Sequence, residues 1–162
     1  MKEDKNFEEI KQILKEANSR MRPIELTLPL KKLVKFCEII DETNLIYREL
    51  SEAKKRGYKQ VPIPESYLLT FISPITHEFF TTGIGKHMGK EIKGIIHTSS
   101  KIEFKEQLYC ETTYLLEMDL KNVIQKKGKM GDFIDTMYQI SLKNGEGKVC
   151  FVDYHEFFMK IN

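Results

Sequence analysis

The chain has 162 residues, of which 41% are hydrophobic and 31% charged, so it can form one domain around a single apolar core. Its 26 basic and 24 acidic residues give a net charge of +2, without the basic excess of nucleic-acid-binding proteins. No apolar run approaches the roughly 18 residues that a membrane span requires. The charged start of the chain is also unlike a secretory signal, so we expect a soluble protein with no nucleic-acid partner and no membrane span.

The first predicted element is an amphipathic helix over residues 5–18. Its apolar residues form a narrow stripe between lysines and glutamates: Phe7, Ile10, Ile13, Leu14 and Ala17. Because the polar face mixes positive and negative charges, the pattern favours packing onto the domain or a partner over binding to a lipid surface. We therefore predict an N-terminal helix over residues 1–20 and a single domain over residues 21–162.

A short strand and two helices come next. Ile24–Leu28 alternates like a strand, and the apolar residues of Leu30–Ile40 recur at helical spacing. The short polar side chains of Asp41–Asn44 compete for backbone hydrogen bonds and end this helix. Glu49–Arg56 predicts a short exposed helix, and Gly57 suits its C-terminal end.

The segment Glu65–Thr81 is the most apolar helical stretch of the chain. We predict an interruption at Pro74, because proline removes a helical hydrogen bond. The apolar residues nearly encircle the helix axis, which indicates a buried helix rather than a surface helix. We therefore expect this helix in the interior of the domain.

The second half of the chain predicts long strands. β-Branched and aromatic residues dominate four segments: Ile92–Phe104, Leu108–Val123, Asp132–Leu142 and Val149–Ile161. The Asn-Gly pair at 144–145 predicts a hairpin turn, and Lys126–Lys129 predicts a second turn. A helical first half followed by consecutive strands is typical of an α+β domain with one antiparallel sheet, against which the apolar helix packs.

The cysteine and histidine residues form no metal-binding pattern. Cys37, Cys110 and Cys150 are widely separated, which argues against a disulfide framework or a zinc site and favours a reducing cytoplasm. The histidines also lack metal-ligand spacing. His97 lies near the start of a predicted strand, where a histidine packed in the core or at the sheet edge is favoured over a ligand contact. We predict no metal and no cofactor.

One stretch, residues 36–71, carries a more specific pattern: FCEIIDETNLIYRELSEAKKRGYKQVPIPESYLLTF. Its elements follow the order of FAxAIGDxNPLYxDxxxAxxxGYxxIPAPPTFL, which is typical of one branch of the MaoC-like, hot-dog-fold dehydratase and hydratase superfamily. The chain resembles this branch, which includes the N-terminal (FAS1-like) MaoC dehydratases and the accessory subunits of the mycolic-acid (3R)-hydroxyacyl dehydratases. Ile96-His97 and Ile102–Phe104 continue the likeness, which covers about residues 22–160.

The resemblance implies a hot-dog fold, in which one antiparallel sheet wraps a long central helix, with the N-terminal helix as an addition. It implies dimers paired across sheet edges, formed either by two copies or with a catalytic hot-dog subunit. The implied ligand is an acyl thioester of coenzyme A or acyl carrier protein, and the implied chemistry is the hydration or dehydration of that acyl group in fatty-acid metabolism.

The functional positions of the family are substituted here. Active members carry Gly-Asp-x-Asn-Pro-Ile/Leu-His, whose aspartate and histidine handle the proton beside the thioester and the water. A glycine N–H near the start of the central helix stabilises the enolate-like oxygen. Glu42 stands at the aspartate position, Tyr47 at the histidine position and Glu65 at the glycine position. Because tyrosine has a pKa near 10, it is a poor base at neutral pH, and the longer Glu42 displaces its carboxylate from the aspartate position.

Two groups of candidate site residues follow. Glu42 and Tyr47 occupy the catalytic positions, and the candidate substrate-binding residues are Asn44, Pro64, Glu65, Ser66 and His97. The leading hypothesis is a non-catalytic or weakly active subunit that binds the acyl chain. The alternatives are an active (R)-specific enoyl-CoA hydratase that uses Glu42 with Tyr47 or His97, and a regulatory domain whose N-terminal helix contacts a partner. The sequence leaves open whether the chain is an enzyme.

Overall fold

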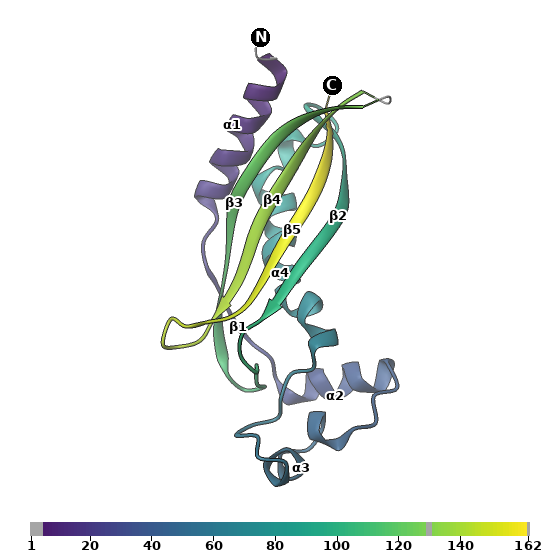
Figure 1. The fold of residues 1–162 in the computed structure, drawn as a ribbon, viewed down its shortest axis with the longest axis vertical. Coiled ribbons are helices and arrows are strands. Elements are labelled where there is room, and N and C mark those ends of the chain that lie inside the picture. Colours follow the sequence, from purple (N-terminus) through teal and green to yellow (C-terminus); the bar gives the residue numbers. More distant parts are fainter. Residues whose placement is uncertain (1–4, 129–130, 162) are drawn as a thin grey trace.

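A computed structural model describes residues 5–128 and 131–161, which contain one five-stranded antiparallel sheet of order β1-β3-β4-β5-β2 (Figure 1). The strands are β1 (Ile24–Thr27), β2 (Ile92–Phe104), β3 (Thr113–Gly128), β4 (Gly131–Lys143) and β5 (Val149–Ile161). The helices are α1 (Lys5–Arg20), α2 (Leu30–Ile39), α3 (Leu50–Lys55) and α4 (Leu68–Glu78). Short 3-10 turns cover Leu45–Tyr47, Glu65–Tyr67 and Gly85–His87, and a π turn covers Phe79–Gly83.

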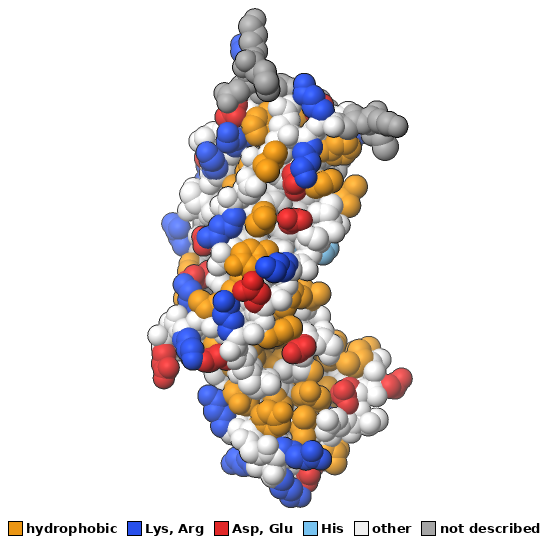
Figure 2. Space-filling model, viewed as in Figure 1, with side chains coloured by type: hydrophobic (Ala, Val, Ile, Leu, Met, Phe, Trp, Pro, Cys, Tyr) orange, Lys and Arg blue, Asp and Glu red, His pale blue; other side chains and the backbone are white. Residues whose placement is uncertain are grey.

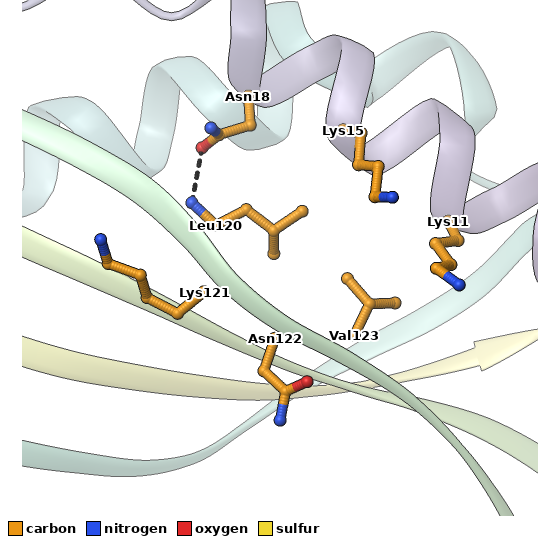
Figure 3. A pocket seen from close by; sticks show the side chains of 7 residues that line it. All are labelled: Lys11, Lys15, Asn18, Leu120, Lys121, Asn122 and Val123. Atoms are coloured by element: carbon orange, nitrogen blue, oxygen red, sulfur yellow. Dashed lines mark hydrogen bonds between the residues drawn. The ribbon is translucent and has the colours of Figure 1, made fainter.

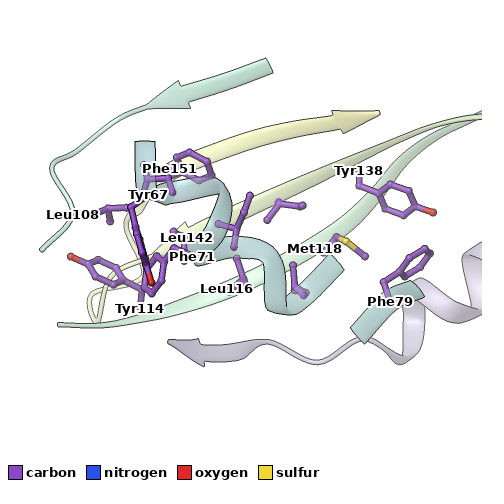
Figure 4. Close-up of a cluster of buried hydrophobic side chains, with 14 of the residues drawn as sticks. Tyr67, Phe71, Phe79, Leu108, Tyr114, Leu116, Met118, Tyr138, Leu142 and Phe151 are labelled. Carbon is purple, nitrogen blue, oxygen red and sulfur yellow. The ribbon is translucent and has the colours of Figure 1, made fainter. Parts of the chain in front are cut away.

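Alternating side chains give the sheet one buried face, which we call the inner face. In β4 the even-numbered residues from Ile134 to Leu142 are buried, and in β5 most odd-numbered residues from Phe151 to Ile161 are buried. Side chains of α4 and the π turn point toward this face, as for Phe71 and Phe79 in Figure 4. The predicted α+β arrangement, with an apolar helix against one antiparallel sheet, is therefore present.

The central helix is more continuous and less enclosed than predicted. α4 runs through Pro74 without interruption. Proline cannot donate to the Thr70 carbonyl oxygen, but the Ser73 hydroxyl donates to that oxygen at 2.8 Å and so satisfies it. The helix also buries only one face, because Leu69 is 48% exposed while Ile72 and Ile75 are buried. The predicted buried helix therefore lies in the core through one face, while the face that carries Leu69 is exposed.

β3 begins later than predicted. Cys110 and Glu111 form a turn, in which Glu111 has the left-handed φ of 54° that interrupts an extended strand. The Glu111 carboxylate accepts a hydrogen bond from the Leu30 N–H at 2.7 Å, at the start of α2. β3 then continues through Gly128, so Lys126 and Lys127 of the predicted second turn are strand residues, and Lys129 lies outside the described residues.

The predicted hairpin turn joins β4 to β5. The side-chain oxygen of Asn144 accepts hydrogen bonds from the N–H groups of Glu146 and Lys148, at 3.0 and 2.9 Å. Gly147, rather than Gly145, takes the positive φ, of 78°, that this turn requires.

β2 is an edge strand, since it pairs with β5 alone within the described part of the chain. Its pairing shifts between His97 and Ser99, so Thr98 is an extra residue that forms a bulge. Ile96 is 63% exposed and Phe104 is 45% exposed on this strand. Because α4 packs over β3, the inner face of β2 is only partly covered.

The N-terminal helix packs against β3 (Figure 1). Its stripe residues Ile10, Leu14 and Ala17 are buried in the same core as the sheet. The Asn18 side chain accepts a hydrogen bond from the Leu120 N–H at 3.0 Å, beside a bulge in β3 (Figure 3). A cavity of about 280 Å³ lies between α1 and β3. Figure 3 shows its lining, with Lys11 and Lys15 on α1 and Lys121 on β3.

The visible surface mixes both signs of charge, with basic and acidic side chains interspersed over the sheet (Figure 2). None of the helices in residues 5–128 and 131–161 has the length and apolar character that crossing a bilayer requires.

Candidate functional site

The loop after α2 holds the residues that stand at the family's catalytic positions. α2 ends where Asp41 adopts a left-handed φ of 54°. The Glu42 carboxylate then accepts a hydrogen bond from the Asn44 N–H at 2.8 Å, and the Asn44 side chain accepts one from the Ile46 N–H at 3.2 Å. Both side chains therefore build the turn that leads into the 3-10 helix Leu45–Tyr47.

Tyr47 lies half-buried in an acidic neighbourhood. Burial raises the pKa of its phenol, and the ionisable Tyr58 and the negative charges of Glu42 and Glu65 raise it further. The negative charges of two predicted site residues therefore act on the phenol of Tyr47. A phenol whose pKa lies above its ordinary value near 10 remains protonated at neutral pH and acts as a hydrogen-bond donor.

The start of the central helix provides the remaining residues of this region. Pro64 is buried and precedes the 3-10 turn, whereas Glu65 and Ser66 are exposed. Glu65 and Leu68 line a cavity of about 280 Å³ together with Phe104 at the end of β2. A residue with a carboxylate thus lines this cavity, at the position where the family pattern has glycine. We call Glu42, Asn44, Tyr47 and Glu65 the loop site.

His97 does not join the loop site. Its ring stacks on His155, with centroids 4.2 Å apart and an interplanar angle of 17°, and its Nε2 donates to the Ser99 carbonyl oxygen at 2.9 Å. All of these partners are on β2 and β5. The structure therefore separates His97 from Glu42 and Tyr47. These are the residues with which His97 was grouped in the hypothesis of an active enoyl-CoA hydratase.

The structure reveals a second polar group, on the inner face of β2 and β5. His155 Nδ1 lies 2.6 Å from Asp153 Oδ2 and 3.1 Å from the Ser100 hydroxyl, which lies 3.1 Å from His97 Nε2. We call His97, Ser100, Asp153 and His155 the sheet cluster. Sequence reasoning missed three of its four members. The one available signal was the alternation of β5, which puts Asp153 in phase with the buried residues Phe151 and Phe157.

Comparison with known proteins gives a family match and structures of similar fold. The family model of the FAS1-like dehydratase domain region matches residues 19–150, while no curated protein matches the chain. The chain is similar to a protein of the ChsH1–ChsH2 complex from Mycobacterium tuberculosis, with 14% identity, 93% of this chain and 95% of that chain covered, and a TM-score of 0.67.

Two further structures have the same fold. The HadBC (3R-hydroxyacyl-ACP dehydratase) complex from M. tuberculosis matches with 15% identity over 85% of this chain and 91% of that chain, with a TM-score of 0.64. The R-hydratase PhaJ1 from Pseudomonas aeruginosa matches with 12% identity over 87% of this chain and 80% of that chain, with a TM-score of 0.64.

These structures show that the chain has the hot-dog fold. The chain belongs to the FAS1-like dehydratase domain family, whose model covers most of its length. The predicted superfamily, its branch and the hot-dog fold with an added N-terminal helix are thereby confirmed.

Proposed function

We propose that this chain is an acyl-thioester-binding subunit of the MaoC-like class, whose loop site holds the ligand but does not perform the hydration. The ligand is an acyl group on the phosphopantetheine arm of coenzyme A or acyl carrier protein. The three buried, free cysteines fit a reducing compartment, and we assign the protein to the cytoplasm.

One observation carries this proposal: a phenol, Tyr47, stands at the family's histidine position, and the Glu42 carboxylate is engaged within its own loop. The Glu42 carboxylate is engaged by the Asn44 N–H, and burial raises the pKa of Tyr47 above its ordinary value. A general base works best when its pKa lies near the operating pH. Glu65 further replaces the small residue that would let a thioester oxygen approach the helix start.

The edge of β2 supports assembly with a second hot-dog chain. This strand has 13 residues and one free edge in the described chain, and Ile96 is exposed on it. A long strand with unpaired N–H and C=O groups is a template for pairing with another chain. HadBC and ChsH1–ChsH2, which share the fold, are complexes of two different proteins.

Ligand-observed NMR with butyryl-CoA tests the binding function directly. We expect butyryl-CoA to bind the purified chain, and absence of binding would overturn the proposal. Any hydration of crotonyl-CoA by the chain should keep its kcat within a few-fold in Tyr47→Phe, because the loop site does not perform the chemistry. A loss of kcat of about 100-fold would instead make Tyr47 a proton-transfer group and contradict the proposal.

Light scattering tests the assembly. The wild-type chain should have the mass of a dimer, whereas Ile96→Lys should be monomeric because it places a charge on the pairing edge. Ile124→Lys is the matched control, since Ile124 is 43% exposed but lies on β3, which β4 and β5 separate from β2. Loss of the dimer in both variants, or in neither, would contradict assembly through β2.

A further inference from the structure

Asp153 occupies a position that is unusual for a carboxylate. On the inner face it lies between Ile140 of β4 and Ile102 of β2 in the strand register. Its side chain is fully buried, and its Oδ1 atom has no hydrogen-bond partner in the described part of the chain. Burying a carboxylate without full compensation is costly, and such groups are concentrated at functional sites.

His155 connects this buried carboxylate to the surface. Asp153 Oδ2 accepts hydrogen bonds from His155 Nδ1 at 2.6 Å and from the Ser100 hydroxyl at 3.4 Å. With its proton held on Nδ1 by Asp153, the imidazole of His155 presents the lone pair of Nε2, which has no partner among the described residues. The His155 side chain is 13% exposed, so this nitrogen belongs to a ring that solvent reaches.

The surroundings of His155 suit an apolar ligand with one reactive polar centre. The exposed ring of His97 stacks on it, and Phe157 lies on the same face, with ring centroids 4.7 Å from His155. Phe80 of the π turn extends this aromatic wall, at 4.8 Å from Phe157. In the single chain the wall is open on the side of β2, the edge at which we propose that a second chain pairs, so a ligand of this site would lie beside that interface.

We propose that the sheet cluster is an acid–base site, in which His155, oriented by Asp153, moves the proton during hydration of an enoyl thioester. This proposal rests on the proposed binding of acyl thioesters and moves the chemistry away from the loop site. Asp153 and Ser100 act as positioning residues, because they reach the ligand only through the imidazoles.

The reaction balances with water as the only co-reactant. His155 Nε2 takes a proton from water as the water oxygen bonds to C3 of the enoyl group. The electron pair of the C2=C3 bond moves onto the thioester carbonyl oxygen as an enolate. The imidazolium, whose charge Asp153 balances, then returns the proton to C2 as the carbonyl re-forms, which gives a 3-hydroxyacyl thioester.

The hydration of crotonyl-CoA by the purified full-length chain tests this assignment. His155→Gln should lower kcat by about 100-fold or more, in line with the usual contribution of a general acid–base group. Asp153→Asn should also lower kcat and change its pH profile, because an amide no longer holds the imidazole in one tautomer. His77→Gln, on the exposed side of α4, is the matched control and should retain wild-type turnover.

Each result decides between the two proposals. Turnover that survives in folded His155→Gln overturns the acid–base site. A wild-type chain that binds butyryl-CoA but does not hydrate crotonyl-CoA also overturns the acid–base site, but it leaves the proposed binding function intact. Failure to bind butyryl-CoA overturns the binding function itself. If His155→Gln does not fold, imidazole NMR of the wild-type chain decides, because butyryl-CoA should shift the ring signals of His155 and His97, and unchanged signals overturn the site.

Discussion

The loop site and the sheet cluster are held in place by different means. In the loop site, Glu42 and Asn44 bond to backbone N–H groups two residues away, and both side chains remain accessible to solvent. In the sheet cluster, Ser100 and Asp153 are brought together by strand pairing across 53 residues of sequence, and the carboxylate is fully buried. Locally bonded side chains move with their loop, whereas the sheet cluster is as rigid as the core beneath it.

The largest loss of stability should come from a substitution in the core beneath the sheet cluster. Phe79 is buried and packs edge-on against Tyr138, with centroids 4.9 Å apart, and Tyr138 lies opposite His155 in the strand register. Phe79→Ala should lower the free energy of unfolding by about 3–5 kcal/mol, through lost burial and the cavity left behind. Urea denaturation measures this change.

The half-exposed Phe104 offers the matched control for this experiment. Phe104→Ala should cost less than about 1.5 kcal/mol, because it removes less buried area. Equal losses for the two variants would show that the helix and the inner face do not form the main core.

Smaller losses of stability should distinguish the sheet cluster from the loop site. His155→Ala leaves the buried carboxylate of Asp153 without its principal donor and should lower the free energy of unfolding by about 1–3 kcal/mol. Glu42→Ala removes a local bond in a partly exposed loop and should cost about 0.5 kcal/mol. The same urea series measures both, and a loop variant more damaging than the sheet variant would reverse the comparison.

The most subtle prediction concerns the pH dependence of the loop site. Because burial, Tyr58 and the charges of Glu42 and Glu65 raise the pKa of Tyr47, folding favours its protonated form. The resulting stability is complete below pH 10, the ordinary tyrosine pKa, and is lost as the pH rises through the folded-state pKa. Glu42→Gln should lower the pKa of Tyr47, as followed by NMR of the tyrosine ring carbon and assigned with Tyr47→Phe. An unchanged pKa of Tyr47 in Glu42→Gln would show that the charge of Glu42 does not act on Tyr47.

Much of the fold follows from local patterns in the sequence. Both β2 and β5 have their predicted bounds, because alternation and β-branched residues extend over their whole length. Pro74 and Glu111 misled the prediction for physical reasons. A neighbouring hydroxyl satisfies the carbonyl that proline leaves free, and a left-handed residue ends the extended chain where composition alone favours a strand.

The candidate site was predictable only in part. The spacing of Glu42, Asn44 and Tyr47 is local, and the charge of Glu42 acts on the phenol of Tyr47. The contact between Ser100 and His155 depends on the register of two strands that are far apart in the sequence, and no single-chain pattern specifies that register. The alternation of β5 could have identified Asp153 as a charged residue in phase with buried ones. It could not have identified Ser100 on β2 as its partner.

The bulge at Thr98 has a consequence for how this strand tolerates changes in length. His97 and Ser100 are separated by an odd interval, which in a regular ribbon sends two side chains to opposite surfaces. The additional residue corrects that parity and lets both face the helix side. Deleting one residue here would turn either His97 or Ser100 to the outer face of the sheet, although all four residues of the sheet cluster would still be present in the chain. Variants of this segment are therefore better judged by residue count than by residue identity.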